Sequence, residues 1–178
     1  MIRNSCSRQY LRYLRSYSSL SSSPEYAFEM AASSIRFGRG STKEIGYDLL
    51  GMGVSKNVCI FTDPYMVNLA PVKEVIEALT RLNIHYSVFS DVQVEPTDKS
   101  LKVAIDYSKK NNFNGFIAVG GGSTIDTAKA ANLYMCNPKN DFFDFVNAPI
   151  GKGLPVPSRL KPLIAVPTTA GTGLSSSL

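Results

Sequence analysis

Cysteine, histidine and tryptophan are scarce in this sequence. Its 178 residues include three cysteines, one histidine and no tryptophan. Cys6, Cys59 and Cys136 are odd in number and far apart, so they indicate neither a disulfide framework nor a zinc site of the CxxC type. Cys59 stands in an apolar run and is expected to be an inert core residue. His85 is expected at the surface or satisfied in the core. The sequence therefore offers no candidate metal ligands and no candidate catalytic residue.

Long apolar runs are absent as well, and the excess of positive charge is confined to one end. No run approaches the roughly 20 apolar residues that cross a membrane, which argues against a membrane span. The net charge is +5, but four arginines (Arg3, Arg8, Arg12 and Arg15) precede the first acid, Glu25. Without residues 1–24 the net charge falls to +1. The basicity belongs to the N-terminal segment rather than to a binding face, which argues against nucleic acid as a partner.

Residues 1–24 have the composition of a mitochondrial presequence. On a helix, Arg8, Arg12 and Arg15 lie opposite a face of tyrosine and leucine. Six of the eight residues from Ser16 to Ser23 are serine, and the segment contains no acid. It lacks the apolar core of about 7–15 residues that a secretory signal needs. The segment predicts import into the mitochondrial matrix; the alternative is a disordered basic tail.

From about residue 35 onward, short apolar runs alternate with helical patterns. The strand candidates are Asn57–Thr62, Ile84–Phe89, Gly115–Val119 and Leu163–Val166. The helical patterns begin at a capping box over Ser41–Glu44, at Pro71, at Thr97 or Asp98, and at Ser123. Strands separated by helices of about 10–15 residues predict βαβ units. We therefore expect one α/β domain with a parallel sheet over residues 25–173, including a short aromatic helical turn at 142–146 and a loop at 147–162.

A glycine-rich turn follows the third strand candidate and opens a helix, in the segment Gly120–Lys129 (GGGSTIDTAK). Glycine allows a positive φ and removes the Cβ that would block a phosphate, and a helix N-terminus presents free N–H groups. Ser123 can cap the helix or bind a phosphate oxygen. The turn fits neither the GxGxxG fingerprint nor a Walker A loop, because Ile125 stands at the third glycine and no GK[ST] follows. It predicts a pyrophosphate site; the alternative is a tight turn with a serine cap.

Polar residues follow two other strand candidates. Asp63 ends the first strand, where ligands of open α/β sheets bind, and its carboxylate can accept hydrogen bonds from ribose hydroxyls. A helix cap before Pro64 is at least an equal alternative. Pro167–Gly173 (PTTAGTG) follows the last strand and combines hydroxyls with glycines, so it can wrap a polar ligand. The alternative for this segment is an irregular loop.

Together these motifs resemble those of the iron-containing (group III) alcohol dehydrogenases. That family carries GGGSxxDxxK after a strand, and PTTxGTGSE some fifty residues later; here they stand as Gly120–Lys129 and Pro167–Gly173. The resemblance implies NAD as cofactor and iron or another divalent metal in the full-length family enzyme. Glu95 falls near a position where relatives also contact the cofactor. The cofactor-binding residues implied by the resemblance are Asp63, Gly121, Gly122, Ser123, Asp126, Thr168, Thr169 and Thr172.

The resemblance also implies an activity, and the end of the sequence departs from the family pattern. Several further segments point to a mitochondrial member that transfers a hydride from 4-hydroxybutyrate to 2-oxoglutarate, giving succinate semialdehyde and 2-hydroxyglutarate. After Gly173 the family has Ser-Glu, whereas this chain reads Leu174–Leu178, a divergent end. The family's metal ligands come from a helical domain that is expected to be missing here. The chain is therefore predicted to be the NAD-binding part, inactive alone. Two alternative functions remain: a general group III alcohol dehydrogenase and a non-catalytic nucleotide-binding fragment. A homo-oligomer is also possible.

Overall fold

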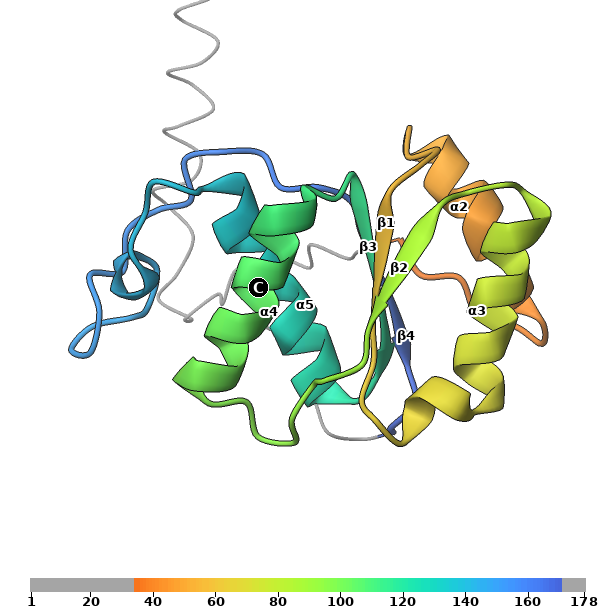
Figure 1. The fold of residues 1–178 in the computed structure, drawn as a ribbon, viewed down its shortest axis with the longest axis horizontal. Helices are drawn as coiled ribbons and strands as arrows, with labels where there is room; N and C mark the ends of the chain where they lie inside the picture. The colour runs from red at the N-terminus through yellow and green to blue at the C-terminus, as the bar shows by residue number, and fades with distance from the viewer. Residues whose placement is uncertain (1–33, 171–178) are drawn as a thin grey trace, which may run out of the picture. The chain divides into compact units, whose positions relative to one another are not determined.

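Four apolar segments form one parallel sheet. The computed structural model describes residues 34–170, so the predictions for residues 1–24, Thr172 and residues 174–178 lie outside the described part. The strands stand in the spatial order β2-β1-β3-β4 (Figure 1). Phe61 is paired with Phe89 and Ala118, and Gly120 with Pro167. The strands are β1 (Val58–Phe61), β2 (Tyr86–Phe89), β3 (Gly115–Gly120) and β4 (Leu163–Pro167).

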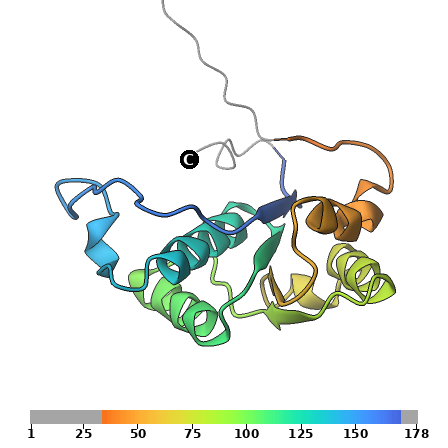
Figure 2. The ribbon, with the colours of Figure 1, turned by 90° about the horizontal axis from the view of Figure 1, so that it is seen from above.

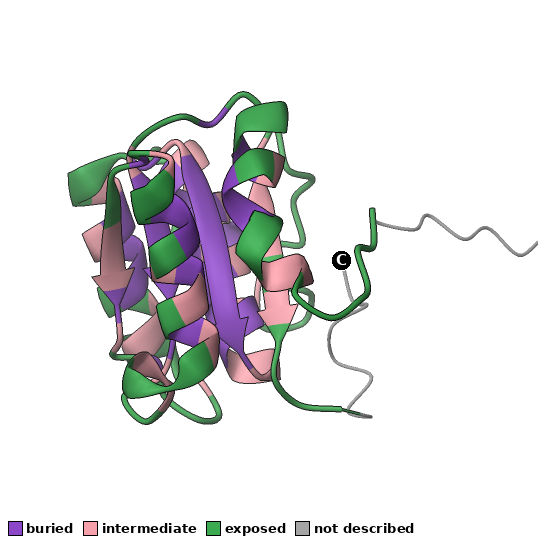
Figure 3. Cartoon of the chain, turned by 90° about the vertical axis from the view of Figure 1, so that its right-hand side faces the viewer, coloured by how far each residue is buried: buried purple, intermediate pink, exposed green. Residues whose placement is uncertain are grey.

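Helices cover both faces of the sheet, which confirms the α/β prediction. The helices α2 (Ile45–Gly51) and α3 (Ala70–Arg81) pack on one face. The helices α4 (Asp98–Asn111) and α5 (Gly122–Cys136) pack on the other (Figures 1 and 2). This double cover explains why β1 and β3 are buried along their whole length, with no alternation of polar and apolar residues. In Figure 3 the buried residues accordingly lie in the middle layer and on the inward sides of the helices.

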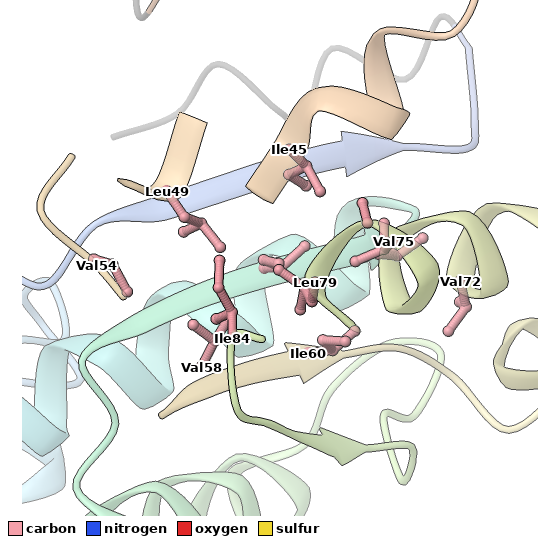
Figure 4. Packing of buried hydrophobic residues seen from close by; sticks show 12 residues of the cluster. Ile45, Leu49, Val54, Val58, Ile60, Val72, Val75, Leu79 and Ile84 are labelled. Carbon is pink, nitrogen blue, oxygen red and sulfur yellow. The ribbon is translucent and has the colours of Figure 1, made fainter. Parts of the chain in front are cut away.

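The core on the α2 and α3 side is aliphatic. Figure 4 shows Val58 and Ile60 of β1 meeting residues of both helices. On α3, Val72, Val75 and Leu79 follow the i, i+3, i+7 spacing of one helix face, and all three are buried. Pro71 stands in the first turn of α3, as predicted, where its missing N–H leaves no hydrogen bond unmade.

The core on the α4 and α5 side is aromatic. The ring of Phe61 lies 5.1 Å from that of Phe89 and 6.0 Å from that of Phe116, measured between centroids. Cys59 is fully buried among these groups, and desolvation raises the pKa of its thiol far above the ordinary value. This agrees with the expected inert core cysteine. His85 is exposed just before β2, as one of its two predicted positions required.

The helix starts agree with the sequence at α4 and differ at α2. Thr97 caps α4, because its Oγ1 accepts the N–H of Ser100 at 3.2 Å and its own N–H donates to Ser100 Oγ at 2.9 Å. The capping box predicted over Ser41–Glu44 is wrong. These residues form the 3-10 helix η1 (Ser41–Glu44), and Gly40, at φ 85°, takes the cap position without a side-chain bond. Ser41 thus lies inside the turn that it was expected to cap.

The connection from α5 to β4 is more ordered than the predicted loop. It contains the 3-10 helix η3 (Phe142–Asp144), which lies within the aromatic turn predicted at 142–146. Asp144 is only 7% exposed and accepts hydrogen bonds from Asn140 Nδ2, the Asp141 N–H and Lys152 Nζ. The connection extends past the outer ends of α4 and α5 (Figure 2). The remaining short element is η2 (Met66–Asn68). Across residues 34–170, no helix has the length and apolarity of a membrane span.

Candidate nucleotide-binding site

The carboxyl ends of all four strands meet at one edge of the sheet, because the strands are parallel. The chain leaves β1 toward β2 on one side and leaves β3 toward β4 on the other. Such a reversal between neighbouring strands is where open α/β sheets bind their ligands. Asp63 follows β1, Gly121 follows β3 and Thr168 follows β4, so residues far apart in sequence come to the same edge.

The glycines of the turn are required for close packing rather than for a positive φ. A Cβ added to Gly120 would lie 2.8 Å from Thr124 Cβ, closer than real side chains approach. A Cβ added to Gly121 would lie 3.3 Å from Thr169 Cγ2. Gly121 has φ −85° and ψ −169°, an extended conformation that other residues also adopt. The positive φ anticipated for this turn is therefore not used. The absence of Cβ atoms lets Thr124 and Thr169 pack directly against the turn.

The N-terminus of α5 begins directly after this turn. The helix starts at Gly122 and runs for 15 residues, and the N–H groups of Thr124 and Ile125 both bond to Gly121 O at 3.1 Å. The N–H groups of Gly122 and Ser123 meet no acceptor in the described part of the chain. Free N–H groups and the partial positive charge of a helix start favour an anion. The oxygens of a phosphate group placed here would accept the N–H groups that lack an acceptor among the described residues.

Ser123 does not cap α5, which settles one alternative from the sequence. The cap position belongs to Gly121, and no side chain caps this helix. Ser123 Oγ instead accepts the N–H of Glu95 at 3.3 Å, and its backbone oxygen accepts Thr127 Oγ1 at 2.7 Å. Asp126 stands half-buried one turn further along α5.

Asp63 takes part in a turn and keeps one oxygen available. Its Oδ1 accepts the N–H groups of Tyr65 and Met66, both at 2.9 Å, so the capping alternative is realised. Within residues 34–170 its Oδ2 accepts no hydrogen bond. The turn fixes the carboxylate in one orientation with an oxygen still free for a ligand hydroxyl. The cap and the binding role are thus compatible.

The loop after β4 lies against the glycine turn. The N–H of Thr168 donates to Gly120 O at 3.0 Å, which continues the pairing of β4 with β3. Thr168 and Thr169 are both exposed, and Thr169 is the neighbour that a side chain at Gly121 would meet. The structure therefore brings these two predicted residues to the turn.

Sequence reasoning missed Thr62, the residue before Asp63. It is fully buried at the carboxyl end of β1, and its Oγ1 has no hydrogen-bond partner in the described part of the molecule. The sequence feature that could have indicated Thr62 is a hydroxyl residue at the end of an otherwise apolar strand.

Metal ligands do not gather in the described residues: no three His, Cys, Asp or Glu side chains there stand close enough to hold an ion.

Known proteins share both the sequence and the fold. The family model for iron-containing alcohol dehydrogenase matches residues 32–177. The mitochondrial hydroxyacid-oxoacid transhydrogenase of Bos taurus is 59% identical over 149 residues, which are 84% of this chain and 32% of that protein. This chain thus spans about a third of the length of such relatives. Their names include the mitochondrial localisation that the sequence predicted.

Solved structures agree with the family. The alcohol dehydrogenase from Oenococcus oeni is 32% identical with a TM-score of 0.66, and the match covers 78% of this chain and 35% of that one. The NADH-dependent butanol dehydrogenase A from Thermotoga maritima is 24% identical with a TM-score of 0.68, over 81% of this chain and 34% of that one. Since the family model extends over most of the sequence, the chain belongs to the iron-containing alcohol dehydrogenase family.

Proposed function

We propose that this chain forms the NAD-binding part of a mitochondrial oxidoreductase that transfers a hydride between small hydroxyacids and oxoacids. The observation that carries the proposal is the turn from β3 into α5. Two N–H groups, of Gly122 and Ser123, are unbonded within the described residues, at the start of the helix that follows the glycine turn. This turn stands in a chain 59% identical to a transhydrogenase with that substrate class in its name.

The described residues supply contacts for a dinucleotide along the edge of the sheet. The pyrophosphate would accept the N–H groups of Gly122 and Ser123 above Gly121. Asp63 Oδ2 would accept a hydroxyl of the adenosine ribose, and Thr168 and Thr169 would lie along the path toward the nicotinamide. Asp126 and Thr172 belong to the same proposed set, as implied by the family motifs. The bound NAD would supply the hydride acceptor and, once reduced, the hydride donor.

The substrate class is proposed from the closely related transhydrogenases. We take 4-hydroxybutyrate as the hydride donor and 2-oxoglutarate as the acceptor, so that one cofactor is reduced and reoxidised in turn. Identity favours this over a general alcohol dehydrogenase: it is 55–59% to the mammalian transhydrogenases of Bos taurus and Homo sapiens, against 32% to the Oenococcus oeni alcohol dehydrogenase. Because the chain spans about a third of those relatives, hydride transfer and any metal ion are proposed for the full-length protein.

Nucleotide titration of the 178-residue chain tests the binding part of the proposal. NAD⁺ added to isotopically labelled protein should shift the amide signals of Gly122 and Ser123 in NMR spectra. Gly121→Val should weaken binding, because its side chain would crowd Thr169 beside the proposed phosphate contacts. Gly51→Ala is the matched control, since a Cβ there meets nothing within 4 Å. Signals that do not move at millimolar NAD⁺ would contradict the proposal.

Localisation is tested separately. Residues 1–30 fused to a fluorescent reporter should direct it to mitochondria, because on a helix the arginines would lie opposite an apolar face and no acid precedes Glu25. Replacing Arg8, Arg12 and Arg15 by glutamate should abolish import. A diffuse cytosolic signal from the unaltered fusion would count against the presequence.

A further inference from the structure

Glu95 has an unusual backbone conformation in the loop between β2 and α4. Its φ is +56°, in the left-handed region that residues with a Cβ rarely occupy. It also precedes Pro96, and a proline ring restricts the backbone of the residue before it. Such an unfavourable conformation persists only where surrounding contacts maintain it, and these conformations cluster at functional sites.

The hydrogen bond that accompanies this conformation reaches the proposed phosphate site. The N–H of Glu95 donates to Ser123 Oγ, 28 positions further along the sequence. A serine hydroxyl has one hydrogen to donate and two lone pairs that accept. The N–H of Glu95 occupies one lone pair of Ser123 Oγ. Within residues 34–170 the hydroxyl hydrogen of Ser123 is donated to no acceptor. The hydroxyl is thereby left as a hydrogen-bond donor at the N-terminus of α5.

We propose that Glu95 is a positioning residue, whose main-chain N–H holds the Ser123 hydroxyl as a donor to a phosphate oxygen of the dinucleotide. The inference rests on the proposed NAD-binding function and adds how one of its contacts is oriented. The left-handed backbone lets the N–H point at Ser123 while the chain turns through Pro96 to Thr97, the cap of α4. The effect belongs to the main chain and not to the exposed carboxylate of Glu95.

Four variants of the 178-residue chain separate these contributions. Glu95→Val opposes a positive φ, because its β-branched side chain crowds the backbone. Glu95→Asn tolerates that φ and keeps the N–H. Glu95→Gln removes only the charge, and Ser123→Ala removes the hydroxyl. NAD⁺ affinity is measured by NMR titration, and thermal unfolding of each variant shows whether it is folded.

The expected pattern is specific to positioning. Ser123→Ala and Glu95→Val should each weaken NAD⁺ binding about ten- to a hundredfold, as for the loss of one hydrogen bond to a charged group. Combining them should weaken it no further, because both remove the same contact. Glu95→Asn should bind NAD⁺ as tightly as the unaltered chain, in contrast to Glu95→Val. Without nucleotide, Ser123→Ala should already move the Glu95 amide signal.

Other outcomes would overturn the inference. Folded Glu95→Val with unchanged affinity would do so, as would a loss in Glu95→Gln equal to that in Glu95→Val, which would assign the effect to the carboxylate. In both cases the unsubstituted chain still binds NAD⁺ and the proposed function stands. If the unsubstituted chain and every variant fail to bind, the proposed function falls and this inference with it.

Discussion

Gly120 and Thr124 are packed against each other at the end of β3, with no room for a side chain between them. A Cβ on Gly120 would lie 2.8 Å from Thr124 Cβ and 3.2 Å from its Cγ2. Thr124 is itself only 2% exposed in the first turn of α5, so it has little freedom to move away. The glycine thus sets how closely α5 approaches β3, and with it where the helix N-terminus faces the proposed nucleotide.

We predict that Gly120→Ala destabilises the fold. The added methyl group overpacks the junction of β3 and α5, which typically costs about 1–3 kcal/mol. The urea midpoint of unfolding should fall accordingly. Gly51→Ala, where a Cβ meets nothing within 4 Å, should leave the midpoint unchanged or raise it. Equal midpoints for Gly120→Ala and the unaltered chain would show that the junction can relax.

We predict that Asp63 favours NAD over NADP. The turn orients its carboxylate through two N–H groups on Oδ1, and a 2′-phosphate near Oδ2 would meet a like charge. Asp63→Asn should reduce the preference for NAD⁺ over NADP⁺, while its side-chain oxygen still caps the turn. Asp63→Gly should narrow it as well, but with a loss of stability on the order of 1 kcal/mol from the missing cap. Titrations with NAD⁺ and NADP⁺ give the ratio; equal affinities in the unaltered chain would refute this role.

The strands were predictable from the sequence, because each is an apolar run that two helical layers bury. Residues 57–62 and 115–119 were expected, and β1 and β3 occupy Val58–Phe61 and Gly115–Gly120. The side chains that order the connections were not predictable in this way. Asn132 is 3% exposed, and its amide bonds both the N–H and the oxygen of Lys161. Nothing in the local pattern indicates a partner 29 residues away.

The candidate site was predictable to the extent that its motifs are local. The glycine turn, Asp63 and the threonines each follow a strand, and parallel strands bring them together. The positive φ at Glu95 and its bond to Ser123 depend on two loops meeting, which spacing alone does not encode. The same holds for Asp144, which lies in the predicted aromatic turn: that prediction gave the helical turn but not the hydrogen bonds from Asn140 and Lys152, which depend on how the chain turns back.

We predict that Asp144 makes stability depend on pH. The hydrogen bond from Lys152 lowers the pKa of this carboxyl most, with help from Asn140 and the Asp141 N–H. A carboxyl with a lowered pKa in the folded state stabilises that state above its ordinary pKa, and this contribution is lost as pH falls through the lowered value. Unfolding midpoints measured between neutral and strongly acidic pH should therefore drop at the acid end.

A pair of variants tests whether Asp144 causes this fall of the unfolding midpoint in acid. Asp144→Asn should lower the midpoint most at neutral pH and flatten its dependence on acid. Asp106→Asn, at an exposed position of α4, is the matched control and should keep the slope of the unaltered chain. Identical slopes for Asp144→Asn and the unaltered chain would place the acid sensitivity elsewhere.

Our last prediction is that the 178-residue chain, expressed by itself, binds NAD⁺ but does not transfer hydride and does not retain stoichiometric iron or zinc. A catalytic metal site usually needs three protein ligands and an open position. In residues 34–170 no three candidate ligands stand together, and His85 lies exposed before β2, whereas the proposed nucleotide loops follow the strands' carboxyl ends. The nucleotide turn is independent of any such ligands, so weak binding should persist. Metal analysis of the purified chain and an assay of hydride transfer from 4-hydroxybutyrate to 2-oxoglutarate test this together. Turnover in a preparation free of longer relatives would overturn it, because the described residues would then have to supply chemistry that their side chains, as arranged here, do not provide.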